Sequence, residues 1–362
     1  MARQSSLTDL HKRNRAVFVE QDGWLLPDHF GDPAGEYRSV VKSTGLFDLA
    51  NHAMLQFSGD DRLSYLQGML SNDLKPLNMF DGQQATILTQ QGKVVADVRV
   101  LCSLNSFYLD FWAPLKEKIL THLQRYLVAD DVEIHDPNEQ WKMLSLQGPS
   151  AVKLLGEVFT GGELPSRANQ HGMVQFDGAP ICVVNADRSG VGGFDLIVQN
   201  ERLETLAQRL TELGAAWVGA RAQNILRIEA GIPRYGVDFS EDNLLLEVGL
   251  DHSYSYTKGC YLGQEVVERI RSRGHVNRKL CGLLLEGNIP ADASDPIIAG
   301  GNEVGKITSS VASFALSRPI ALGYLNRRFW EPGSKLTVRH QNLEIEADVA
   351  ALPFTAPSPG SS

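Results

Sequence analysis

The sequence has few cysteines, no long apolar run and no excess of positive charge. Four cysteines among 362 residues are too few for a disulfide scaffold. The apolar runs fall far short of the roughly 18 residues that span a bilayer, and the N-terminus lacks the apolar core of a signal peptide. With 34 basic and 43 acidic residues, the net charge of −9 argues against general binding to polyanions. These absences predict a soluble, chemically reduced, cytoplasmic protein.

Common cofactor and metal motifs are also missing. The chain contains no Gly-x-Gly-x-x-Gly and no Gly-Lys-Ser/Thr loop, so dinucleotide and P-loop sites lack their signatures. It has no Cys-x-x-Cys and no His/Cys pair at metal-ligand spacing, so no metal site within the chain is expected.

Helical and strand patterns alternate irregularly over residues 1–275, which is typical of an α+β region rather than a doubly wound sheet. Leucines at helical spacing predict helices at 60–70, 114–128 and 201–213, and residues 219–230 are expected to form another helix that ends at Gly231. Short β-branched or aromatic segments predict strands at 52–57, 93–101, 106–112, 181–185 and 194–198. Residues 276–352 consist almost entirely of strand and turn patterns, which predicts a separate small β-barrel domain. The Pro/Ser-rich residues 353–362 are expected to form a disordered tail.

One cysteine lies in an unusual segment. Cys260 comes just before a helix expected to begin at Gln264, and the helix dipole together with Lys258 favours a reactive thiolate. The more common alternative is a small buried hydrophobic residue. The remaining cysteines, Cys102, Cys182 and Cys281, are expected in the core.

Two aspartates interrupt predicted strands. Asp97 shares a strand face with Val95 and Leu101, where a desolvated carboxylate could serve as a general base or a hydrogen-bond anchor. The alternative is a solvated face on which Asp97 pairs with Arg99. Asp195 follows two glycines in a strand of apolar residues, and its alternative is a charge on an edge strand.

Basic residues occur at two further places of interest. Arg221 begins a predicted helix, where a cation opposes the helix dipole unless an anion or buried acid accompanies it. Simple surface placement is the alternative. A basic run could contact the phosphates of tRNA or form a solvated connector between domains. It consists of Arg269, Arg271, Arg273, His275, Arg278 and Lys279.

Several segments together resemble the folate-binding superfamily of the glycine-cleavage T-protein, the aminomethyltransferases. They keep the family's order along the chain: residues 45–49, 71–73, 219–231, 235–238 and 304–309. The form Lys-Gly-Cys-Tyr-x-Gly-Gln-Glu resembles the YgfZ branch, folate-binding proteins tied to iron–sulfur cluster maintenance and, in some descriptions, to tRNA modification. Its residues are Lys258, Gly259, Cys260, Tyr261, Gly263, Gln264 and Glu265.

The resemblance implies a fold of three modules around a central hole or cleft, with tetrahydrofolate as the cofactor. It implies catalytic roles for Cys260 and Asp97, and folate-binding roles for Asp97, Asp195 and Arg221. The chain departs from the transferases at Ala96, where they carry a second acid, and at residues 50–52, where they carry Ser-His-Met.

The implied function is that of a folate-binding accessory protein. It would support assembly or repair of iron–sulfur enzymes through Cys260, with iron–sulfur assembly proteins or client enzymes as partners and no membrane. One alternative is a folate-dependent aminomethyltransferase or other one-carbon transferase. Another is a binding protein associated with tRNA modification, which would present the basic run.

Overall fold

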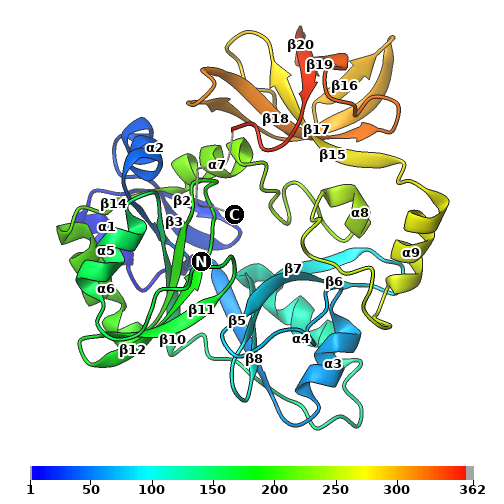
Figure 1. Ribbon diagram of the computed structural model, residues 1–362. Helices are drawn as coiled ribbons and strands as arrows, with labels where there is room; N and C mark the ends of the chain where they lie inside the picture. The colour runs from blue at the N-terminus through cyan, green and yellow to red at the C-terminus, as the bar shows by residue number, and fades with distance from the viewer. Residues whose placement is uncertain (1, 356–362) are drawn as a thin grey trace.

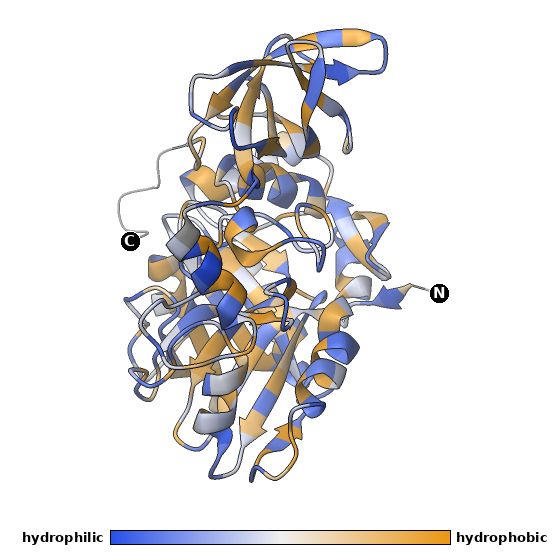
Figure 2. Ribbon diagram, turned by 90° about the vertical axis from the view of Figure 1, so that its right-hand side faces the viewer, coloured by the Kyte–Doolittle hydropathy of each residue, from blue (hydrophilic) through white to orange (hydrophobic). Residues whose placement is uncertain are grey.

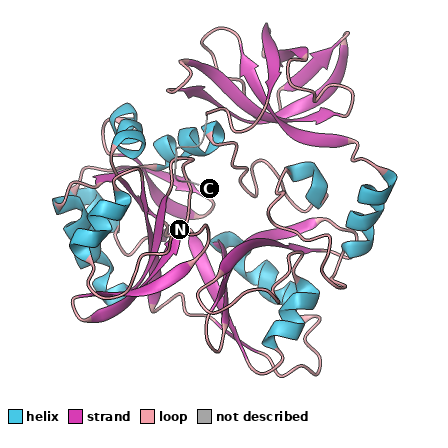
Figure 3. Cartoon of the chain, viewed as in Figure 1, coloured by secondary structure: helices cyan, strands magenta, loops and turns pink. Residues whose placement is uncertain are grey.

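The computed structural model describes residues 2–355, apart from the side chain of Arg273. The chain forms two α+β modules and a C-terminal barrel, which surround a central region (Figure 1). Strands make up the inner parts of all three, and most helices of the α+β modules lie on their outer sides (Figure 3). The expected α+β class is therefore confirmed. None of the helices in the described part of the chain is long and apolar enough to cross a membrane.

The first module is a five-stranded sheet with two helices. The strand order is β6 (Gly82–Leu88), β7 (Val94–Cys102), β8 (Phe107–Trp112), β5 (His52–Ser58) and β9 (Glu133–His135). The helices are α3 (Arg62–Met69) and α4 (Lys116–Gln124), which follows the short 3-10 helix η1 (Ala113–Leu115). Leu66 of α3 and Ile119 and Leu123 of α4 are buried in the core of this module, whereas Leu63 of α3 is exposed.

The second module is a six-stranded sheet. The strand order is β11 (His171–Phe176), β12 (Ala179–Asn185), β13 (Gly193–Gln199), β10 (Trp141–Gln147), β4 (Gly45–Asp48) and β14 (Ala216–Trp217). Its core also contains apolar residues of α1 (Thr8–Arg13), α5 (Ala151–Val158) and α6 (Asn200–Glu212). Hydrophobic residues concentrate along the strands (Figure 2). A small sheet of β1 (Arg3–Gln4), β3 (Trp24–His29) and β2 (Val17–Gln21) precedes α2 (Pro33–Lys42).

The predicted C-terminal barrel is confirmed as a closed, six-stranded barrel. The strand order is β15 (Arg278–Leu285), β18 (Arg318–Asn326), β17 (Asn302–Ser313), β16 (Pro296–Ala299), β19 (Lys335–His340) and β20 (Leu343–Ala350). The ordered chain continues past the boundary expected at residue 352, because the Phe354 amide donates a hydrogen bond to the Glu229 carbonyl at 2.9 Å. The rest of the predicted tail, residues 356–362, lies outside the described residues.

Helix α7 (Ala220–Glu229) joins the barrel to the rest of the chain. The buried Glu229 carboxylate accepts hydrogen bonds from Tyr37 Oη on α2 and from Ser313 Oγ on β17, both at 2.5 Å. Two residues earlier, Arg227 pairs with the buried Asp238 at 2.6 Å and donates to Ser309 Oγ at 2.8 Å. These buried polar contacts fix the barrel against α7.

The chain between α7 and the barrel returns to the first module. It contains α8 (Leu245–Val248) and α9 (Gln264–Arg273). Apolar side chains of this segment, including Tyr235, Phe239 and Tyr261, are buried in the first module's core. The segment also forms part of the wall of the central cavity described next.

Candidate active site

A cavity of about 450 Å³ lies where the two α+β modules, α7 and the following segment meet. This volume lies within the range typical of small-molecule and cofactor sites. The residues on which the argument below depends are Gln21, His52, Asp97, Arg99, Asp110, Trp112, Arg188, Gln223, Asn224, Arg227, Arg234 and Tyr235. They come from elements far apart in the sequence, so only the folded chain brings them together.

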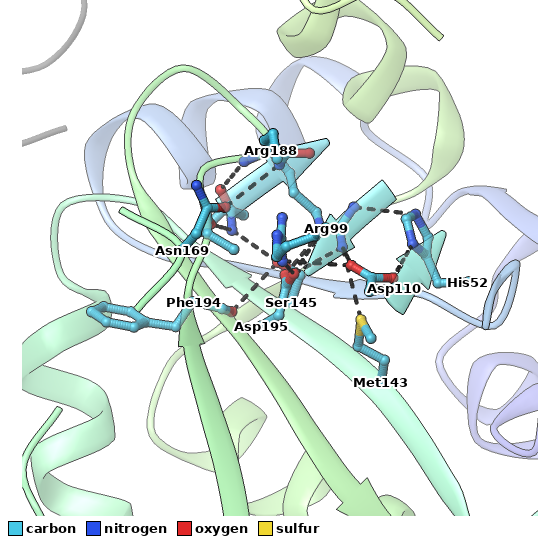
Figure 4. Close-up of polar contacts among 12 residues, drawn as sticks. His52, Arg99, Asp110, Met143, Ser145, Asn169, Arg188, Phe194 and Asp195 are labelled. Atoms are coloured by element: carbon cyan, nitrogen blue, oxygen red, sulfur yellow. Dashed lines mark hydrogen bonds and ion pairs between the residues drawn. The ribbon is translucent and has the colours of Figure 1, made fainter. Parts of the chain in front are cut away.

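Five charged or titratable side chains form a buried charge cluster beside this cavity (Figure 4): His52, Arg99, Asp110, Arg188 and Asp195. Arg99 donates to Asp195 at 2.5 Å and lies 3.6 Å from Asp110, its partner residue across the β7–β8 pair. Arg188 donates through Nη2 to Asp195 at 2.8 Å and to Asp110 at 3.3 Å. Since β7 and β8 belong to the first module and β13 to the second, the buried charge cluster links the two modules.

The charges within this cluster balance, with two arginines facing two aspartates. Burial opposes ionisation of Asp195, but Arg188 and Arg99 outweigh it and hold the pKa of Asp195 below its ordinary value. Burial also opposes ionisation of Asp110, but His52 and the same two arginines outweigh this effect and lower the pKa of Asp110. Both aspartates are therefore charged at neutral pH, and they form ion pairs with the two arginines.

His52 has a defined protonation state in this arrangement. Its Nδ1 lies 3.0 Å from Asp110 Oδ1, and its Nε2 lies 3.1 Å from Arg188 Nη1. Because arginine can only donate, Nε2 accepts this hydrogen bond and Nδ1 carries the proton. Burial and the charge of Arg188 both lower the pKa of His52, which agrees with a neutral ring.

Asp97 lies on the cavity wall without a cation of its own. It is partly buried in the middle of β7, and no other side chain in the described part of the chain donates a hydrogen bond to it. Burial raises the pKa of Asp97 to about 6, and the negative charge of Asp110 adds to this effect. The alternative of an Asp97–Arg99 pair on a solvated strand face is wrong, because Arg99 is buried and pairs with Asp195.

Asp195 lies behind the cavity wall. Its side chain is fully buried in β13, which pairs with β12 on one side and β10 on the other, so the edge-strand alternative is wrong. Both carboxylate oxygens accept hydrogen bonds from Arg188, and one also accepts from Arg99. Asp195 itself does not line the cavity, but Arg99 and Arg188, which it binds, do. Its folate-binding role stays a prediction.

Arg221 lies on the outer side of α7. Its side chain is 56% exposed and pairs with Asp28 at 2.5 Å, which fits simple surface placement. The cavity is lined instead by Ala220, Gln223, Asn224 and Arg227, the face that the helical period of 3.6 brings together. The folate contact that the resemblance implies for Arg221 stays a prediction. Gln223, Asn224 and Arg227 of the same helix are better placed to contact a ligand, because they line the cavity.

Cys260 is exposed and does not line the cavity. It lies four residues before α9, in a loop that Lys258 attaches to the first module. The buried Lys258 ammonium group donates to the carbonyl oxygens of Gln67, Leu70 and Asn72 at 2.8, 2.6 and 2.8 Å. These carbonyls lie at and after the C-terminal end of α3, where a cation is favoured. Lys258 therefore fixes the loop that presents Cys260.

Replacing Lys258 with methionine should lower the free energy of unfolding by about 2 to 4 kcal/mol, because three carbonyls at this buried position lose a charged donor. Urea denaturation would measure the loss. Lys279→Met is a matched control, since Lys279 is an exposed lysine on β15. Equal stability of the two variants would contradict an anchoring role for Lys258.

Cys260 should be alkylated by iodoacetamide before the other three cysteines. Burial raises the pKa of Cys182 to about 12 and that of Cys281 to about 11, and it also raises the pKa of Cys102. Timed labelling at pH 7.5 with peptide mass spectrometry would give the four rates. Labelling of Cys260 at the rate of the buried thiols would show that its loop is closed in solution.

The basic run spans the end of α9 and the start of the barrel. Arg271 lies 3.7 Å from Glu268 and its guanidinium group lies over the Tyr256 ring, whereas Arg278 pairs with Glu247. Two of its cations therefore have partners within the chain, which fits a connector between modules. Binding to tRNA stays a prediction.

Three residues of the buried charge cluster were missed by sequence reasoning: His52, Asp110 and Arg188. Asp110 follows the pattern that identified Asp195, an aspartate inside a strand of apolar and aromatic residues, so this signal was available. His52 begins a strand and Arg188 lies in the loop between β12 and β13, and nothing local distinguishes either from a surface residue.

Comparison with known proteins agrees with this architecture. Residues 7–258 match the GCVT N-terminal domain, and residues 278–355 match the glycine cleavage T-protein C-terminal barrel domain. The chain is 31% identical to an aminomethyltransferase of Rubrobacter xylanophilus over 354 residues, covering 97% of this chain and 94% of that protein. It is 30% identical to an aminomethyltransferase of Thermus thermophilus, covering 97% and 99%. The crystal structure of the glycine cleavage system aminomethyltransferase T from Bartonella henselae has the same fold, with a TM-score of 0.92, 22% identity and 99% coverage of both chains.

Proposed function

The chain belongs to the glycine cleavage T-protein family, and on this premise we propose that it is a tetrahydrofolate-binding one-carbon transferase of the aminomethyltransferase type. The observation that carries the proposal is Asp97, a partly buried carboxylate on the cavity wall with no cation of its own. A carboxylate in such a place is suited to bind or exchange a proton with a ligand.

The cavity residues fit tetrahydrofolate. A reduced pterin carries several N–H donors, and the Asp97 carboxylate is an acceptor that no other side chain in the described part of the chain uses. The wall also contains the buried donors Arg99 Nε and Trp112 Nε1, which have no partner among residues 2–355. They suit the carbonyl oxygen and ring nitrogens of the same ligand, because buried polar groups are normally hydrogen-bonded.

When bound, tetrahydrofolate would supply the nitrogen atoms that accept a one-carbon unit. Asp97, with its pKa raised to about 6, is charged at neutral pH but holds a proton more readily than an ordinary carboxylate. It can therefore accept a hydrogen bond from the ligand and exchange a proton with it. The buried charge cluster pairs Arg99 and Arg188 with Asp195 and Asp110, so the charge of Arg188 lowers the pKa of Asp97 less than burial raises it.

Isothermal calorimetry with tetrahydrofolate, followed by a glycine-cleavage assay with the lipoyl carrier protein, tests this function. Binding and turnover would both support it. Binding without turnover would favour a folate-binding protein of another activity, and absence of binding would contradict the proposal.

A second candidate function comes from the position of Cys260. Its exposed thiol on an anchored loop, away from the cavity, suits a contact with another protein. It supports the YgfZ-type function that the resemblance implies, in which the protein assists iron–sulfur enzymes through this cysteine. Cys260→Ser should then fold and bind tetrahydrofolate normally but fail to restore iron–sulfur enzyme activity in cells that lack the protein. Full complementation by Cys260→Ser would exclude this candidate.

A further inference from the structure

We propose that Arg234 binds a carboxylate of the ligand, so that the cavity selects folates with a glutamyl tail over free pterins. The inference rests on the proposed function, because it assigns one end of the same ligand. It depends on Arg234, with Asp97 at the other part of the cavity, and on no residue of the buried charge cluster.

Arg234 differs from the other arginines that line the cavity. These are Arg99, Arg188 and Arg227. Arg99 and Arg188 pair with Asp195 and Asp110, and Arg227 pairs with Asp238. Among residues 2–355, only Arg234 of these four has no carboxylate within ion-pair distance.

The guanidinium group of Arg234 retains unused hydrogen-bonding capacity. Its Nε is buried and has no partner among the described residues. Gln21 also lines the cavity, and with its side-chain amide turned so that the oxygen faces Arg234, this oxygen accepts from both terminal nitrogens, at 2.9 Å from Nη2. A neutral amide satisfies part of the donor set but leaves the positive charge unpaired. A planar guanidinium group is well suited to a carboxylate, which it can bind through two parallel hydrogen bonds.

The backbone below Arg234 is held firmly. The Arg234 amide donates to Asp238 Oδ2 at 2.9 Å, and the Asp238 amide donates back to the Arg234 carbonyl at 2.8 Å. The same Asp238 carboxylate binds Arg227 and the barrel residue Ser309. The cation is therefore mounted on a fixed turn, which reduces the conformational entropy lost when it binds an anion.

The positions of Arg234 and Asp97 indicate which chemical groups the ligand carries at its two ends. Asp97 lies on β7, and Arg234 lies in the turn that follows α7, so the two charged groups approach the cavity from different elements. A ligand that meets both needs hydrogen-bond donors at one part and an anionic group at another. The pterin ring and the glutamate carboxylates of tetrahydrofolate have this arrangement, whereas a free pterin has only the first part.

The experiment compares calorimetric affinities of two ligands, tetrahydrofolate and a tetrahydropterin without the aminobenzoyl-glutamate. Arg234→Gln should weaken tetrahydrofolate binding roughly ten-fold or more and leave tetrahydropterin binding unchanged. Arg234→Lys should retain part of the preference, because it keeps the charge but loses the planar donor pair. Arg209→Gln, at an exposed arginine on α6, is the matched control. Circular dichroism melting would confirm that each variant is folded.

Three results would overturn the inference. In the first, Arg234→Gln binds tetrahydrofolate as tightly as the parent does. In the second, it loses affinity for both ligands by the same factor. In the third, Arg221→Gln shows the selective loss instead. The first two distinguish this inference from the proposed function, since the parent protein still binds tetrahydrofolate in both. A parent that binds neither ligand would contradict the proposed function as well.

Discussion

Replacing Asp195 with alanine should lower the free energy of unfolding by about 3 to 5 kcal/mol. The change leaves Arg99 and Arg188 buried with one aspartate between them, since Asp195 accepts from both at 2.5 and 2.8 Å. Because Arg99 belongs to the first module and Asp195 to the second, the contact between modules weakens as well. The resemblance to the T-protein family predicts a loss of folate affinity from the same substitution, but the structure places its largest effect on stability.

Urea denaturation of the parent and the variant would measure this loss. Asp9→Ala, at an exposed aspartate, is the control and should leave the midpoint unchanged. The double variant Arg99→Met/Asp195→Ala should lose less than the sum of its two single variants, because removing both partners leaves fewer unpaired buried charges. An Asp195→Ala protein as stable as the parent would show that the buried charge cluster does not hold the modules together.

Asp97→Asn should reduce one-carbon transfer by about 10² to 10⁴-fold, the usual contribution of a positioned acid or base. The variant keeps the shape and much of the hydrogen bonding of the side chain but cannot exchange a proton. Steady-state rates with tetrahydrofolate and the lipoyl carrier protein would show the effect. Asp60→Asn, on an exposed loop, is the matched control. Unchanged turnover in Asp97→Asn would remove Asp97 from the chemistry.

The pH dependence of stability provides an independent test of the same residue. Burial raises the pKa of Asp97 to about 6, so the folded chain binds this proton more tightly than the unfolded chain. Protonated Asp97 therefore stabilises the fold below pH 4, and this contribution is lost as the pH rises through 6. Asp97→Asn should be more stable than the parent by about 3 kcal/mol at pH 7.5, and the difference should vanish near pH 4. A large loss of stability at pH 7.5 would mean that Asp97 is structural.

The sequence was sufficient for much of the fold because local patterns determine most of its elements. The sequence predicted a helix at 219–230 that ends at Gly231, and the structure has α7 at Ala220–Glu229. Alternation predicted the strand that carries Asp97 as 93–101, and the structure has β7 at Val94–Cys102. The turn-rich C-terminal region closes into the expected barrel, in which β16 to β18 pair with their neighbours in the chain and β15 closes the barrel against β18 and β20.

The partners of the site residues could not be predicted in the same way. Periodicity placed Arg99 on the same strand face as Asp97, but only the contact between modules shows that Asp195 takes this arginine. Which face of α7 lines the cavity also depends on how the modules pack together. This packing places Gln223, rather than Arg221, in the cavity wall. Long-range packing, not local propensity, therefore decides which charges in this site are free.

The hydrogen bonds to Glu229 on α7 also limit how the chain can be divided. Its carboxylate accepts from the barrel through Ser313 Oγ and the Ala315 amide, and its neighbour Arg227 donates to Ser309. A fragment ending at residue 275 would lose these partners, leaving a carboxylate and a guanidinium group evolved for burial at a newly exposed surface. The barrel therefore acts as a cover that completes the N-terminal region, and truncation at the apparent domain boundary would yield an incomplete folding unit.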